Sequence, residues 1–91
     1  MEVEVGRVTH FYSHICVAVV ELNASLKLGD KIHILGHTTD FTQRVNSIEV
    51  DHHPVVWVKP SDNVAIKVIG PVREHDMIYR VMEEIAEPYL A

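Results

Sequence analysis

Short apolar stretches that repeat with a period of two, separated by turn residues, constrain the fold of this chain more than any other feature. Residues 2–5, 31–35 and 64–68 show the pattern most clearly, because valines or isoleucines alternate there with charged, polar or small residues. Such alternation puts every second side chain on one face of a β-strand, whereas a helix needs apolar residues three and four positions apart. The apolar run 15–20 is rich in valine and favours a strand that is either buried on both sides or part of a barrel.

Turn residues and changes of parity indicate how these strands are arranged. Turn signals come at intervals of about 8–12 residues, which is typical of a small sandwich or barrel. The inward parity changes at Gly6 and again near residues 46–47, within a strand expected over 41–50, and such changes indicate bulges that curve a sheet. We therefore predict an all-β fold, a small closed or partly open antiparallel β-barrel of six to seven strands. A short C-terminal tail follows, in which residues 83–86 form one helical turn.

Length and charge narrow the functional classes. A chain of 91 residues is enough for one domain, so residues 1–91 are expected to form a single domain. Eight Lys and Arg oppose thirteen Asp and Glu, giving a net charge of −5, and the cations form no cluster along the sequence. Proteins that coat nucleic acid carry a basic face, so only a local contact to a single-stranded end fits this composition.

Signals for membranes or secretion are not found in the sequence. The longest apolar run has six residues, far below the roughly 20 needed to cross a bilayer. Residues 1–4 lack the basic start of a secretory signal. We therefore predict a cytoplasmic protein without membrane contact. The single cysteine, Cys16, lies inside the apolar run and is expected to be a buried, inert thiol.

Five phrases of the sequence together resemble the second domain of translation GTPases, the β-barrel beside the nucleotide-binding domain of elongation-factor-type proteins. In chain order they are residues 5–8, 26–34, 45–48, 60–66 and 72–78. The resemblance implies such a barrel standing alone, because the sequence has no Gly-x-x-x-x-Gly-Lys-Ser/Thr loop and GTP binding is not expected. Ser61 and His75 stand where that family has glycine, which predicts either a positive φ angle at both residues or reshaped turns.

Seven histidines are the one oddity of the composition. A metal-binding face of the His-x-x-x-His kind needs a helix, and the pairs at 10/14, 33/37 and 52/53 lie in predicted strands and loops. Solvated loop histidines are therefore the favoured interpretation, and neither a metal nor another cofactor is assigned. Glu49 and Asp51 are likewise interpreted as solvated charges rather than as a catalytic acid and base.

Recognition is expected at the loops around residues 10–14, 36–40 and 51–59, because barrel proteins often bind ligands at the rim or in a surface groove. Trp57 belongs to the core if it shares the parity of Val55, which is the favoured interpretation. If it faces outward beside His53 and Arg44, it offers a stacking surface. The candidate partner-binding residues are Phe11, Tyr12, His37, Arg44, His53 and Trp57.

The leading functional hypothesis is a non-enzymatic binding module of the translation-factor barrel type, which recognises a protein partner or an RNA end and works in a complex or as a homo-oligomer. Similar barrels are also attached to the carboxyl end of some collagenase-like peptidases, where they resemble accessory modules. The first alternative is therefore an accessory barrel that works with a separate enzyme of that kind. The second is a His-rich metal-binding protein. A likeness of fold alone does not decide between them.

Overall fold

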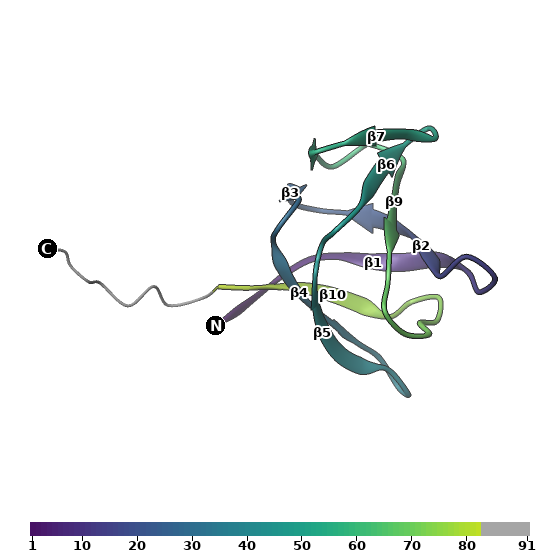
Figure 1. Cartoon of the computed structure of the whole chain (residues 1–91). Coiled ribbons are helices and arrows are strands. Elements are labelled where there is room, and N and C mark those ends of the chain that lie inside the picture. Colours follow the sequence, from purple (N-terminus) through teal and green to yellow (C-terminus); the bar gives the residue numbers. More distant parts are fainter. Residues whose placement is uncertain (83–91) are drawn as a thin grey trace, which may run out of the picture.

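The computed structural model describes residues 1–82, and these residues form strands and turns without any helix (Figure 1). The strands are β1 (Glu2–Tyr12), β2 (Val17–Leu22), β3 (Leu26–Lys27), β4 (Lys31–Leu35), β5 (Asp40–Arg44), β6 (Ile48–Val50), β7 (His53–Val55), β8 (Trp57–Val58), β9 (Val64–Lys67) and β10 (Met77–Val81). The predicted all-β fold is confirmed, with ten strands in place of six or seven. The helical turn and tail predicted after residue 82 lie outside the described residues.

Eight strands form one antiparallel sheet in the order β5-β4-β10-β1-β2-β9-β6-β7, and β3 pairs with β8 in a separate ribbon. In Figure 1, β6, β7 and β9 form the upper part of the sheet, and β4 and β5 form the lower part. The long strand β1 bends where its register shifts between Glu4 and Gly6 and again between Val8 and His10. The shift at Gly6 confirms the predicted bulge, and a side chain at Gly6 would collide with the carbonyl oxygen of Glu21.

The barrel is partly open, because no backbone ladder joins the outer strands β5 and β7 in the described part of the chain. The side chain of Gln43 on β5 reaches the end of β9 and the residues that follow it. Its Nε2 donates to the carbonyl oxygen of Lys67 at 3.0 Å, and its Oε1 accepts from the backbone N–H of Ile69 at 2.9 Å. Gln43 is only 8% exposed. A single buried amide therefore ties β5 to the segment that follows β9.

One aliphatic core fills the barrel. Its buried apolar residues are Val5, Val8, Ala18, Val20, Leu22, Leu26, Ile32, Ile34, Val45, Ile48, Val58, Val64, Ile66, Val68, Val72 and Ile78. Phe11 and Phe41 pack against this core from its margin. The inward sets predicted for strands 31–35 and 64–68 are confirmed. The strand expected over 41–50 is divided at residues 45–47, because β5 pairs with β4 whereas β6 pairs with β7 and β9.

Three turns share one local design, at residues 27–30, 59–62 and 73–76. In each turn the fourth residue is an aspartate whose carboxylate accepts a hydrogen bond from the backbone N–H of the first residue. The N–Oδ2 distances are 2.8 to 3.0 Å. The third residue has a positive φ angle: Gly29 at 91°, Ser61 at 84° and His75 at 79°. The positive φ predicted for Ser61 and His75 is therefore confirmed, and both turns keep the conformation that favours glycine.

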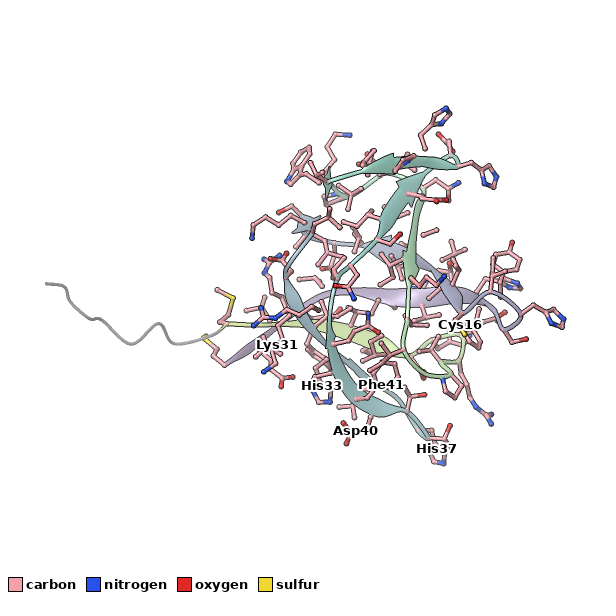
Figure 2. The ribbon with its side chains drawn as sticks, viewed as in Figure 1. Cys16, Lys31, His33, His37, Asp40 and Phe41 are labelled. Atoms are coloured by element: carbon pink, nitrogen blue, oxygen red, sulfur yellow. The ribbon has the colours of Figure 1, made fainter. Side chains whose placement is uncertain are left out.

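The expectation of a buried Cys16 was wrong. Strand β2 begins only at Val17, and Cys16 lies exposed in the β1–β2 turn with a φ of 55° (Figure 2). The apolar run 15–20 is also not buried throughout, because Ile15 is 57% exposed. Within β2, Ala18 and Val20 face the core, whereas Val17 and Val19 are only half-buried on the opposite face.

Candidate functional site

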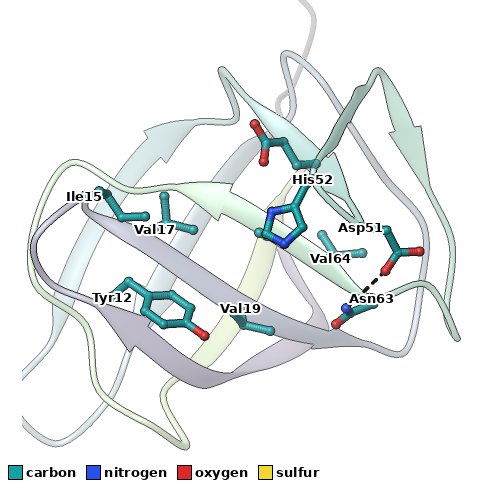
Figure 3. A pocket seen from close by; sticks show the side chains of 10 residues that line it. Tyr12, Ile15, Val17, Val19, Asp51, His52, Asn63 and Val64 are labelled. Atoms are coloured by element: carbon teal, nitrogen blue, oxygen red, sulfur yellow. Dashed lines mark hydrogen bonds between the residues drawn. The ribbon is translucent and has the colours of Figure 1, made fainter.

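The outward face of β2, β9 and β6 carries a hollow of about 310 Å³, which we call the outer groove (Figure 3). It is lined by Tyr12, Ile15, Val17, Val19, Glu49, Asp51, His52, Asn63, Val64 and Ala65. The register explains its shape. Ala65 stands opposite Val19 on one side and Glu49 on the other, so a methyl group lies between two longer side chains. The floor is apolar, and both carboxylates of the lining come from the β6 end.

The rim of the outer groove is formed by Tyr12 at the end of β1 and by residues of the β6–β7 turn. Figure 3 shows the rings of Tyr12, from β1, and His52, from the β6–β7 turn, flanking the valines of β2. Asp51 and His52 form a two-residue hairpin turn with φ angles of 51° and 68°. Both angles are positive, as a type I′ turn requires, although neither residue is glycine. The Asp51 carboxylate accepts a hydrogen bond from Asn63 Nδ2 at 3.4 Å.

A second surface surrounds Trp57, and we call it the basic surface. The expectation that Trp57 belongs to the core was wrong: its side chain is 53% exposed, while Val58 beside it is fully buried. Trp57 pairs across the ribbon with Lys27 and lines a hollow of about 270 Å³ with Lys27, Asp30 and Arg80. A neighbouring hollow of about 330 Å³ adds Lys31 and Arg44.

Four of the eight Lys and Arg therefore gather around Asp30, although the sequence shows no cationic cluster. Asp30 Oδ1 lies 2.8 Å from Lys27 Nζ, and Asp30 Oδ2 lies 3.8 Å from Arg80 Nη1. Arg44 Nη1 donates to the carbonyl oxygen of Gly29 at 3.1 Å. One carboxylate thus holds two cations in place beside the Trp57 ring, which makes a preorganised surface that combines aromatic and charged groups.

The predicted partner-binding residues do not form one site. Trp57 and Arg44 belong to the basic surface, and Tyr12 belongs to the outer groove. Phe11 packs against the core margin, and His37 lies exposed at the tip of the β4–β5 hairpin (Figure 2). His53 is exposed on β7, where its Nδ1 lies 2.9 Å from the carbonyl oxygen of Asp51.

Among the contacts between described residues, only His33 is a histidine held between two carboxylates. Its Nδ1 lies 2.9 Å from Glu2 Oε1, and its Nε2 lies 2.6 Å from Asp40 Oδ1. Figure 2 shows His33 and Asp40 close to each other on β4 and β5. Hydrogen bonds to Asp40 and then to Glu2 raise the pKa of His33 above 6.5. Both ring nitrogens are engaged, so this network favours a structural cross-link between β1, β4 and β5.

The histidines, cysteine and carboxylates of the described residues form no metal-binding group. Within residues 1–82, no three His, Cys, Asp or Glu side chains are grouped so that they could hold a metal ion. The metal-binding alternative therefore gains no support from the arrangement of the histidines. The same part of the chain has no helix with the length and apolar character needed to cross a membrane.

Comparison with known proteins gives relatives among peptidases. The chain matches no protein-family profile. An uncharacterized protease of Methanocaldococcus jannaschii is 39% identical over 85 residues, which cover 92% of this chain and 21% of the protease. The chain thus spans about a fifth of the length of this relative.

Two crystal structures share the fold. Both are of the C-terminal domain of a Geobacillus thermoleovorans protein that carries the name U32 peptidase, and one is its selenomethionine variant. The TM-scores are 0.80 and 0.78, at 21% and 22% identity. The matches cover 86% and 82% of this chain and 91% and 95% of the solved domains. At this level of identity the likeness establishes a common fold.

The resemblance to the second domain of translation GTPases therefore has to be corrected. The relative that matches almost the whole chain is a protease, and the solved domains come from a U32 peptidase. Ser61 and His75, which stand at glycine positions of the five phrases, do have positive φ angles. The phrases do not identify the family.

Proposed function

We propose that this chain is a non-catalytic accessory domain that works with the catalytic region of a U32-type peptidase. The observation that carries the proposal is the match to the archaeal protease, which covers nearly all of this chain but only about a fifth of the relative. About four-fifths of the relative is then available for the catalytic machinery. The shared fold with a C-terminal peptidase domain supports the same role. A cytoplasmic location stays a prediction, and an RNA end is no longer proposed as a partner.

The basic surface is the part of the chain that we propose to contact the peptidase. Trp and Arg are the residues that most often dominate the binding energy of protein interfaces. Trp57 exposes more than half of its side chain, and Asp30 holds Lys27 and Arg80 beside it. Because Asp30 already pairs with Lys27 and Arg80, these two side chains lose less conformational entropy on docking than unpaired ones would.

The test uses the 91-residue chain and a separately produced U32 peptidase catalytic region from the same organism. Calorimetry measures their association, and a fluorescein-labelled denatured protein reports hydrolysis. We expect the chain alone to release no fluorescence, and the complex to bind at least about tenfold more weakly after Trp57→Ala. Tyr12→Ala is the matched control, because it removes an aromatic ring of similar exposure from the other surface.

Two results would contradict the proposal. Hydrolysis by the chain alone that survives further purification would make it an enzyme, and equal affinities for wild type and Trp57→Ala would remove the basic surface from the interface. Light scattering on the chain without peptidase tests the predicted homo-oligomer. A mass above that of one chain supports it.

A further inference from the structure

Among the residues that the structure describes, the outer groove combines an apolar floor with two carboxylates that have no Lys or Arg partner. The floor consists of Val17, Val19 and Ala65. Each of these residues is half-buried and faces the groove, on the side of the sheet opposite the barrel interior. A second hollow, of about 260 Å³, shares Ile15, Val17, Glu49 and Ala65 with the first. The two hollows together extend the apolar floor along β2 and β9.

The charges at the β6 end of the groove are not neutralised within residues 1–82. The Glu49 carboxylate has no hydrogen bond or ion pair to any other described residue, and Asp51 accepts one hydrogen bond, from the neutral amide of Asn63. No Lys or Arg lines the larger hollow, and Lys67 belongs only to the second one. Elsewhere in the described chain, carboxylates such as Asp30 and Glu21 have a cationic neighbour.

We propose that the outer groove binds a Lys or Arg side chain of an extended peptide. The aliphatic stem of such a residue would lie on Val19 and Ala65, and its charged head would reach Glu49 and Asp51. Long cationic side chains bury their methylene groups against apolar surface while the head stays in a polar environment. The Tyr12 ring at the rim adds a face that attracts a cation. The proposed role beside a peptidase is not needed for this inference.

Other side chains fit the groove less well. A purely apolar side chain would cover the floor but would remove water from two carboxylates without supplying a partner, which is unfavourable. An acidic side chain would meet like charges. The chemistry of the lining therefore selects for a residue that is both cationic and aliphatic, and only Lys and Arg have that combination.

The experiment measures binding of three fluorescent pentapeptides to the 91-residue chain by polarisation at low salt. Their sequences are Gly-Val-X-Val-Gly with X as lysine, norleucine or glutamate. We expect the lysine peptide to bind at least about tenfold more tightly than the other two, and Glu49→Gln to weaken it about tenfold. Ala65→Phe fills the groove from its outer face and should abolish binding, with circular dichroism confirming that the barrel persists.

Glu4→Gln is the matched control for charge. It removes one negative charge, as Glu49→Gln does, from an exposed position on β1 that does not line the groove. The inference is overturned if Glu4→Gln and Glu49→Gln weaken the lysine peptide equally, because the attraction would then be general. It is also overturned if the norleucine peptide binds as well as the lysine peptide, or if no peptide binds at millimolar protein.

Discussion

Replacing Gln43 with methionine should open the partly closed side of the barrel without leaving a cavity, because the two side chains have similar length and volume. Gln43 Nε2 donates to the carbonyl oxygens of Arg44 and Lys67, both at 3.0 Å, and Oε1 accepts from the Ile69 N–H at 2.9 Å. Methionine has no donor for the two carbonyl oxygens, and its thioether sulfur is only a weak acceptor for the Ile69 N–H. The substitution therefore removes the described side-chain bridge between β5 and the segment after β9.

The expected loss is about 2 kcal/mol of unfolding free energy. A typical hydrogen bond contributes roughly 0.5–1.5 kcal/mol net, and a buried polar group left without a partner costs roughly 1–3 kcal/mol. The cost of each unpaired backbone group lies in the lower part of its range, because the side chains of Lys67 and Ile69 are exposed and water can reach their backbone. For a domain of this size, such a loss lowers the melting temperature by roughly 8–16 °C.

Thermal and urea unfolding followed by circular dichroism measure this effect. The slope of free energy against urea should not change, because the surface exposed on unfolding is the same. Thr42→Met is the matched control, since it puts the same side chain on the exposed face of β5 and should change stability by less than about 0.5 kcal/mol. A Gln43→Met variant as stable as Thr42→Met would refute the reasoning that this amide closes the barrel.

Two further predictions concern strain and pH. Ser61→Gly and His75→Gly should each stabilise the fold by about 1 kcal/mol, because relief of strain at φ angles of 84° and 79° exceeds the entropic cost of glycine. The urea concentration at the midpoint of unfolding measures this effect. A lower midpoint in either variant would contradict the prediction. His33 has a raised folded pKa, so its contribution is complete below pH 6.5 and is lost as pH rises through the folded value. The melting temperature of the wild type should therefore be higher at pH 6 than at pH 8.5, and this difference should shrink in His33→Gln. If His33→Gln keeps the full difference, another group is responsible.

Local pattern predicts strands well where the chain stays with one partner. Residues 31–35 form β4 at the bounds that the sequence predicts, since a clear turn signal precedes them and alternation continues through them. It fails where a strand changes partner. The parity change near residues 46–47 indicates an irregularity but not that β5 pairs with β4 while β6 pairs with β9, because that exchange is decided by closure of the barrel.

The same reason explains the errors at the candidate surfaces. Trp57 shares the sequence parity of Val55, yet the bend at Val56 between β7 and β8 turns Trp57 outward and Val58 inward. The basic surface could not be predicted from local sequence, since Lys27 and Arg80 lie more than fifty residues apart and meet only through Asp30. Parity assigns a face to a residue, whereas a site depends on which distant strands lie side by side.

The outer groove, in contrast, left a signal in the sequence that can be interpreted physically. Residues 15–20 are apolar on both parities, which predicts a strand covered on both faces. A barrel of this size has one interior, so only one face of β2 can be buried there, and Ala18 and Val20 occupy it. Within residues 1–82 no strand covers the other face, and Val17 and Val19 are shielded only in part by Tyr12 and His52. An apolar face that the described fold does not cover, beside two carboxylates without cations, is best explained by a ligand that supplies both missing partners.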